Sequence, residues 1–149
     1  MSVRVLITDE SPAIRDAIRR NLECIGCEIV AEAATTEQAL TLFRTVHPEI
    51  VTLGVDLAYS EEANPLHLIH LIKREAPRTS VLMIAGALPL LPHDAEMFKQ
   101  AGALACFVAP FEFASLWQNL SRAHPELMAG AFATMMSATA AVKASRALR

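Results

Sequence analysis

Short apolar, β-branched runs alternate with amphipathic patterns along most of this chain, and this alternation constrains its fold more than any other feature. The runs are VRVLIT (3–8), CEIVAEA (27–33), EIVTL (49–53), SVLMIA (80–85) and ALACFV (103–108). Between and after them, apolar residues recur at helical spacing. The predicted helices are Pro12–Ile25, Thr36–Val46, Pro65–Glu75, Pro92–Ala101 and Glu112–Ala123. Near-continuous apolar strands separated by helices predict a parallel sheet with helices on both faces.

Local signals support the same division. Ser11 before Pro12 is typical of a helix N-cap followed by proline at the first helical position. Gly26 and Gly102 stand where helices end. Strand–helix units of this kind form a doubly wound domain, whose functional edge lies at the carboxyl ends of the strands.

Composition excludes several classes of protein. The length of 149 residues suits one domain with a sizeable core, and the net charge of −3 gives no electrostatic reason to expect nucleic-acid binding. No apolar run approaches the roughly 18 residues of a membrane span, and no signal peptide is evident. Three cysteines without an export signal favour free thiols and a cytoplasmic location.

The order of the motifs resembles the receiver domain of bacterial two-component response regulators, over residues 3–123. The segments VLITDESPAIRDAIRRNLE and EIVAEAATTEQALTLFRTVHPEIVTL are similar to the first half of that domain. IKREAPRTSVLMIAG and AGALACFVAPFEFASLWQNL are similar to its fourth and fifth strand regions. The resemblance implies an α/β, flavodoxin-like (βα)5 doubly wound parallel sheet with strand order 2-1-3-4-5.

Receivers of this family accept a phosphoryl group on an aspartate that ends the third strand. An acidic pair helps that aspartate to hold Mg²⁺, whose charge offsets that of the phosphoryl group. By resemblance the acidic pair here is Asp9 and Glu10. Pro48 sets the register of the third strand, and the acceptor position falls on Gly54. Glycine has no side chain and so offers neither nucleophile nor metal ligand.

The two other conserved roles of that family also fall on inert residues. Ala85 stands where the family has a serine or threonine, and Ala109 stands where it has a lysine. Neither alanine can bond or neutralise a phosphoryl oxygen. Losing the aspartate and the lysine together avoids an unpaired charge in a semi-buried cleft. We therefore predict a degenerate, non-enzymatic pseudo-receiver whose degenerate site is Gly54, Ala85 and Ala109.

Two chemical alternatives stay open. Asp56 is a candidate substitute acceptor with Mg²⁺, but two residues along a strand displace a carboxylate by about 6–7 Å. The favoured interpretation of Asp56 is an acidic loop residue that is exposed to solvent. Asp9 and Glu10 are expected to bind Mg²⁺ weakly or to remain as a solvated pair that caps backbone amides, and no other cofactor is expected. A sensor of small ligands is a further functional hypothesis, but the sequence has no glycine-rich phosphate loop to support it.

Two pairs of residues have the spacing of metal ligands. Cys24 and Cys27 are predicted at the edge of the sheet opposite the acidic pair, and are interpreted as structural. His67 and His70 are three residues apart on a predicted helix with no evident third ligand, which favours an ordinary helix surface.

The segment PELMAGAFATMMSATAAVKASRALR (125–149) differs in composition from the rest. It predicts a receiver domain at 1–124 and a C-terminal helical extension at 125–149, with an extra helix of about 20 residues. Met128, Phe132, Met135 and Val142 form an apolar stripe on that helix. The stripe predicts a homodimer or a partner-binding surface, and the alternative is folding back on its own domain.

These observations lead to one functional hypothesis. The protein is expected to act in phosphorelay signalling as a phosphorylation-independent adaptor that binds proteins through its fourth helix, fifth strand and fifth helix. The expected partner is a histidine kinase, another receiver or an output protein. The competing hypothesis is a phosphorylation-competent receiver that uses Asp56 and Mg²⁺.

Overall fold

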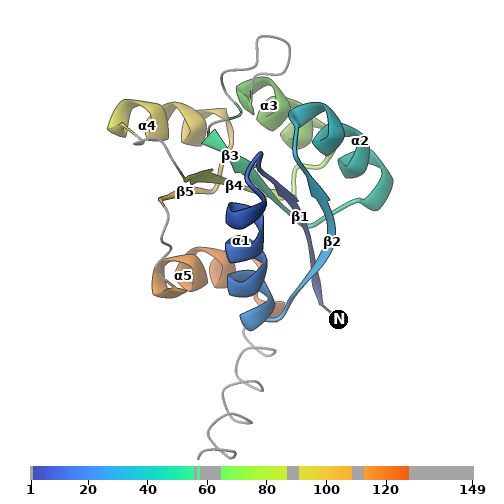
Figure 1. Ribbon diagram of the computed structural model, residues 1–149. Coiled ribbons are helices and arrows are strands. Elements are labelled where there is room, and N and C mark those ends of the chain that lie inside the picture. The colour runs from blue at the N-terminus through green and yellow to red at the C-terminus, as the bar shows by residue number, and fades with distance from the viewer. Residues whose placement is uncertain (1, 56, 58–64, 87–90, 109–112, 128–149) are drawn as a thin grey trace, which may run out of the picture.

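The computed structural model describes residues 2–55, 57, 65–86, 91–108 and 113–127 (Figure 1). The strands are β1 (Val3–Thr8), β2 (Cys27–Ala33), β3 (Ile50–Gly54), β4 (Ser80–Ala85) and β5 (Ala105–Val108). The helices are α1 (Pro12–Cys24), α2 (Thr36–Val46), α3 (Pro65–Glu75), α4 (Pro92–Ala101) and α5 (Phe113–Ala123). All strand pairs are parallel and the order is β2-β1-β3-β4-β5, which confirms the predicted fold and strand order.

Side-chain caps fix the starts of α1 and α2. The Ser11 hydroxyl accepts a hydrogen bond from the Ile14 amide (3.3 Å) and caps α1. Thr35 caps α2 in the same way by accepting from the Gln38 amide (3.1 Å). The Gln38 side chain reaches back and accepts from the Ala34 amide (2.9 Å), so this start resembles a capping box.

Helix ends account for small differences from the predicted boundaries. α1 ends at Cys24, because Ile25 is its C-cap and Gly26 then takes a φ of +93° that suits glycine. Gly102 has a φ of +124°, and the next amide, that of Ala103, donates back to Phe98 O (3.0 Å). This closing turn uses residues predicted for the strand, so β5 begins at Ala105 rather than at position 103.

The core has one layer on each face of the sheet, as Figure 1 shows from the placement of the helices. On one face, α1 and α5 contribute Ile18, Leu22, Leu116 and Leu120 to a buried cluster with β1, β3 and β4. On the other, α2, α3 and α4 contribute Ala39, Phe43, Leu68, Ile69, Ile72 and Phe98. The first cluster also contains Leu127, beyond the end of α5, which is only 2% exposed.

The predicted extra helix and its stripe of Met128, Phe132, Met135 and Val142 lie outside the described residues. The domain division at 124/125 therefore stays a prediction. In the part of the chain that the structure describes, none of the helices has the length and apolar character needed to cross a bilayer.

Candidate functional site

The carboxyl ends of the central strands bring three of the predicted site positions to one edge of the sheet. Thr8 pairs with Leu53, so Asp9, which directly follows β1, lies beside Gly54, the last residue of β3. Ala85 ends β4, the other neighbour of β3. Ala109 and Asp56 lie outside the described residues.

The Asp9 carboxylate fills the space beside Gly54. A Cβ atom placed on Gly54 would lie 2.6 Å from Asp9 Oδ2 and 3.1 Å from Asp9 Cγ. The first distance is shorter than any contact that packed side chains tolerate. As the site stands, a side chain at position 54 and the observed position of the Asp9 side chain exclude each other.

Asp9 is held in this position by its own chain neighbours. Its Oδ1 accepts a hydrogen bond from the Ser11 amide (2.9 Å), and its own amide donates to Ala33 O (3.0 Å). The side chain therefore caps a backbone amide, as expected. The expectation that it is solvated was wrong for Asp9, which is only 4% exposed, whereas Glu10 is exposed. Asp9 is buried because it directly follows β1, between the two neighbouring strands. Glu10, one residue later, already lies in the exposed loop before α1.

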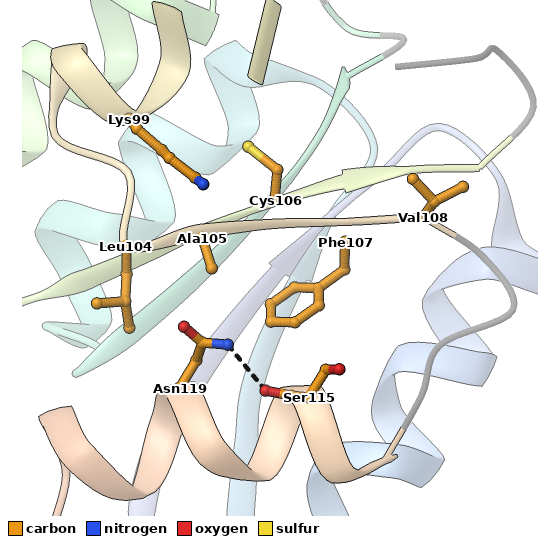
Figure 2. Close-up of a pocket in the computed structure, with 8 residues that line it drawn as sticks. All are labelled: Lys99, Leu104, Ala105, Cys106, Phe107, Val108, Ser115 and Asn119. Atoms are coloured by element: carbon orange, nitrogen blue, oxygen red, sulfur yellow. Dashed lines mark hydrogen bonds between the residues drawn. The ribbon is translucent and has the colours of Figure 1, made fainter. Parts of the chain in front are cut away.

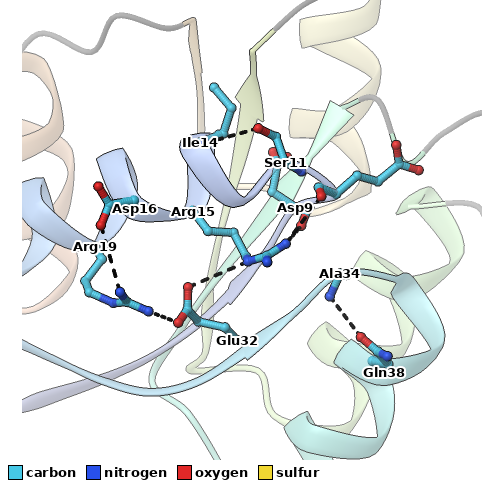
Figure 3. Close-up of polar contacts among 10 residues, drawn as sticks. Asp9, Ser11, Ile14, Arg15, Asp16, Arg19, Glu32, Ala34 and Gln38 are labelled. Carbon is cyan, nitrogen blue, oxygen red and sulfur yellow. Dashed lines mark hydrogen bonds and ion pairs between the residues drawn. The ribbon is translucent and has the colours of Figure 1, made fainter.

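Arg15 is a member of this site that the sequence interpretation missed. Its Nη1 donates to the carbonyl oxygen of Asp9 (2.6 Å; Figure 3) and also to that of Glu10 (3.4 Å). Arg15 Nε and Arg19 both pair with the Glu32 carboxylate of β2. The spacing of Arg15 and Arg19, four residues apart on one helix face, was the signal available in the sequence. A guanidinium this close weakens the attraction of the acidic pair for a metal cation.

The end of β4 also lacks a side chain that could bind a phosphoryl group. Ala85 is fully buried and carries no hydroxyl. Directly after it, a Cβ on Gly86 would lie 3.1 Å from Ile14 Cδ1, so α1 packs closely over this point.

The residues present are a poor match to Mg²⁺. This ion prefers six oxygen ligands in near-ideal octahedral geometry, of which one or two are usually carboxylates whose oxygens are free to turn toward it. At the described part of this edge, Asp9 and Glu10 supply the carboxylates, and one Asp9 oxygen already accepts the Ser11 amide. Weak Mg²⁺ binding is compatible with this arrangement, but a tight site is not.

A second feature lies on the face formed by α4, β5 and α5. An open groove of about 460 Å³ is lined there by Lys99, Leu104, Ala105, Cys106, Phe107, Val108, Ser115 and Asn119 (Figure 2). Val108 is 53% exposed and Leu104 is 37% exposed, although both are large apolar residues. Asn119 Nδ2 donates to the Ser115 carbonyl oxygen (2.8 Å), which orders the α5 side.

Cys24 and Cys27 lie at the predicted edge of the sheet, and His67 and His70 lie on a helix surface, as expected. Cys24 ends α1 and Cys27 begins β2, at the edge opposite Asp9. Burial, and to a lesser degree the Glu49 carboxylate, raises the pKa of Cys27 to about 12. His67 and His70 are exposed on α3, and among the described residues neither pair belongs to a cluster of three metal ligands.

Comparison with known proteins agrees with this architecture. The sequence matches the family model of the response regulator receiver domain over residues 5–121. Protein CcdB of Bacillus subtilis is 28% identical over 122 residues, which cover 80% of this chain and 95% of that protein. Chemotaxis protein CheY of Thermotoga maritima is 25% identical over 122 residues, or 82% of this chain and 98% of that protein. Among solved structures, the receiver domain of NtrX from Brucella abortus has a TM-score of 0.68 at 28% identity, covering 80% of this chain and 96% of that one. The family model spans most of the chain, and the chain therefore belongs to the response regulator receiver domains, the signalling modules of two-component systems.

Proposed function

We propose that this receiver domain signals without accepting a phosphoryl group, and that it acts as a protein-interaction module. The observation that carries the proposal is the packing of Asp9 against Gly54, where a Cβ atom would lie 2.6 Å from Asp9 Oδ2. The space that an acceptor side chain needs is occupied by a carboxylate that a hydrogen bond from Ser11 holds in place.

The neighbouring positions support the same conclusion. Ala85 offers no hydroxyl, and Ala109 offers no cation to pair with a phosphoryl oxygen. Meanwhile Arg15, on α1, contacts the backbone of the acidic pair and pairs with Glu32. This guanidinium lies beside the acidic pair and opposes the binding of a second cation there.

The binding surface in this proposal is the groove between α4, β5 and α5. Its exposed Val108 and Leu104 supply apolar contact area, and Lys99 supplies a cation at the rim. Aliphatic contacts with a polar rim are typical of protein interfaces. The partner is a histidine kinase, another receiver or an output protein, and its binding does not depend on phosphorylation.

The direct test is incubation with acetyl phosphate and Mg²⁺, followed by intact mass spectrometry. We expect no added phosphate on the full-length protein. Asp56→Asn is the matched variant. Phosphate that appears on the unchanged protein and disappears with Asp56→Asn would refute the proposal and establish the competing hypothesis of a substitute acceptor.

Metal binding gives a second test of the same site. We expect Mg²⁺ to bind with millimolar affinity or weaker, because one Asp9 oxygen already accepts the Ser11 amide and the Arg15 guanidinium lies beside the pair. A titration followed by amide chemical shifts measures this. Micromolar binding, with shifts that extend beyond Ala85, would show that a working switch persists.

The C-terminal extension is proposed as a second interaction element, through the stripe of Met128, Phe132, Met135 and Val142. Light scattering of the full chain and of a truncated chain tests whether it forms a homodimer. The truncation is made after Leu127, because that residue packs in the core. A dimer that becomes a monomer on truncation supports the proposal, and two monomers of equal stability contradict it.

A further inference from the structure

Three potential metal ligands meet at the amino-terminal edge of the sheet, opposite the receiver site. Glu49 directly precedes β3, and His124 and Glu126 follow α5. One ligand atom from each of the three lies within 4.8 Å of the other two. The imidazole is buried and the two carboxylates are exposed, so an ion could enter from solvent.

The backbone that carries these ligands is fixed on both sides. Glu49 N donates to Arg4 O (2.9 Å), and Ser80 N donates to Glu49 O (2.9 Å). On the other side, Leu127 N donates to His124 O (3.0 Å), and the buried Leu127 side chain anchors the turn that contains Glu126. Ligands held this way need little reordering when an ion binds.

The His124 ring is oriented as in many metal sites. Its Nε2 is 2.9 Å from the Ser80 hydroxyl, in a buried hydrogen bond. When Nε2 carries the ring proton and donates it to Ser80, Nδ1 has a free lone pair. Nδ1 lies 3.8 Å from Glu126 Oε1, longer than a hydrogen bond. Metal bonds of about 2.1 Å separate two ligands of one ion by roughly 3.4–4 Å, which fits this spacing.

The electrostatics of the cluster favour a cation. Within the described ranges, no lysine or arginine forms an ion pair with Glu49 or Glu126. The Glu49 carboxylate also contributes to the raised pKa of the buried Cys27, which stays a neutral thiol. The donors available here are therefore one imidazole nitrogen and carboxylate oxygens.

We propose that Glu49, His124 and Glu126 bind one divalent transition-metal ion of the zinc class, with a remaining position open to water. Zinc accepts this mixture of nitrogen and oxygen ligands, whereas Mg²⁺ prefers oxygen alone. The ion joins the chain segment after α5 to the loop before β3, and so fixes the end of the receiver core. This site is independent of phosphoryl transfer.

Titration calorimetry of the full-length protein with Zn²⁺ tests the site, with Glu126→Gln as the variant. Both Glu126 and Glu96 are exposed, so Glu96→Gln on α4 is a matched control that loses the same charge elsewhere. We expect one Zn²⁺ per chain, binding weakened at least about tenfold by Glu126→Gln, and no change with Glu96→Gln. Circular dichroism verifies that both variants are folded.

The spectrum of bound Co²⁺ identifies the ligands. We expect the d–d bands of a nitrogen- and oxygen-ligated ion, with the His124 side-chain resonances shifted. A thiolate-to-cobalt charge-transfer band would place the metal on the cysteines and overturn the proposal. Equal Zn²⁺ affinity in Glu126→Gln and the unchanged protein, or no binding at all, would also overturn it, and would leave the test with acetyl phosphate unaffected.

Discussion

The Gly54→Asp substitution returns a carboxylate to the end of β3 and tests whether Asp9 really occupies the space of a phosphoacceptor. The substituted Cβ would meet Asp9 Oδ2 at 2.6 Å, so the Asp9 carboxylate must move. Moving it breaks the hydrogen bond that its Oδ1 accepts from the Ser11 amide (2.9 Å).

The expected loss of stability has two parts. A hydrogen bond to a charged group contributes about 1.5–3 kcal/mol, and this part is lost with any side chain at position 54. The second part is repulsion between carboxylates, which reaches about 4 kcal/mol for charges roughly 4 Å apart at an effective dielectric constant of ~20. Gly54→Asn has nearly the same size without the charge, so it isolates the first part.

Guanidinium unfolding followed by far-UV circular dichroism measures both parts. We expect the free energy of unfolding to fall in the order unchanged protein, Gly54→Asn, Gly54→Asp. Added Mg²⁺ should narrow the gap between the two variants, because a divalent ion screens paired carboxylates. Mg²⁺ should not change the free energy of unfolding of Gly54→Asn.

Either of two results would refute this reasoning. If Gly54→Asn unfolds at the same denaturant concentration as the unchanged protein, the space beside Gly54 is open and Asp9 does not fill it. If Gly54→Asp and Gly54→Asn are equally stable without Mg²⁺, the introduced carboxylate does not experience the charge of Asp9.

Three further predictions concern the core and the thiols. Leu120→Ala, at a fully buried position of α5, should lower the free energy of unfolding by about 2–5 kcal/mol, and a loss below this range in denaturant unfolding would show that the cavity collapses. Thr52 has a buried hydroxyl without a partner among the described residues, so Thr52→Val should raise stability by about 1 kcal/mol in the same assay; a decrease would reveal a bound water. Burial raises the pKa of Cys27 to about 12, whereas Cys24 is exposed. Iodoacetamide at about pH 8 should therefore modify Cys24 in the folded protein and Cys27 only after denaturation, as peptide mass analysis would show.

Most of the fold could be predicted from the sequence, because its signals are local. The apolar runs and the helical spacing between them are properties of short segments. The Ser11 cap and the positive φ angles of Gly26 and Gly102 are also decided within a few residues. The boundaries were less accurate. β5 begins late because a hydrogen bond from Ala103 to Phe98 extends the closing turn of α4.

The arrangement of the site depended on contacts between distant segments. A glycine at position 54 could be read as the loss of a nucleophile, but the sequence does not show which side chain takes the vacant space. The parallel register places Asp9 beside it, and burial between strands then keeps that carboxylate out of solvent. Arg15 is close to the acidic pair in the sequence, but its pairing with Glu32 of β2 joins segments that lie apart along the chain.

The sequence by itself determined the order of the elements, the parallel sheet and the absence of reactive side chains at Gly54 and Ala85. Only the tertiary structure decided that Asp9 is buried, that Leu127 belongs to the core, and that Glu49 and His124 meet across more than half of the chain. The physical reason is that periodicity and turn chemistry act between neighbours in sequence. Side-chain contacts at the edges of a sheet are set by strand register and by close packing of the helices that cover it.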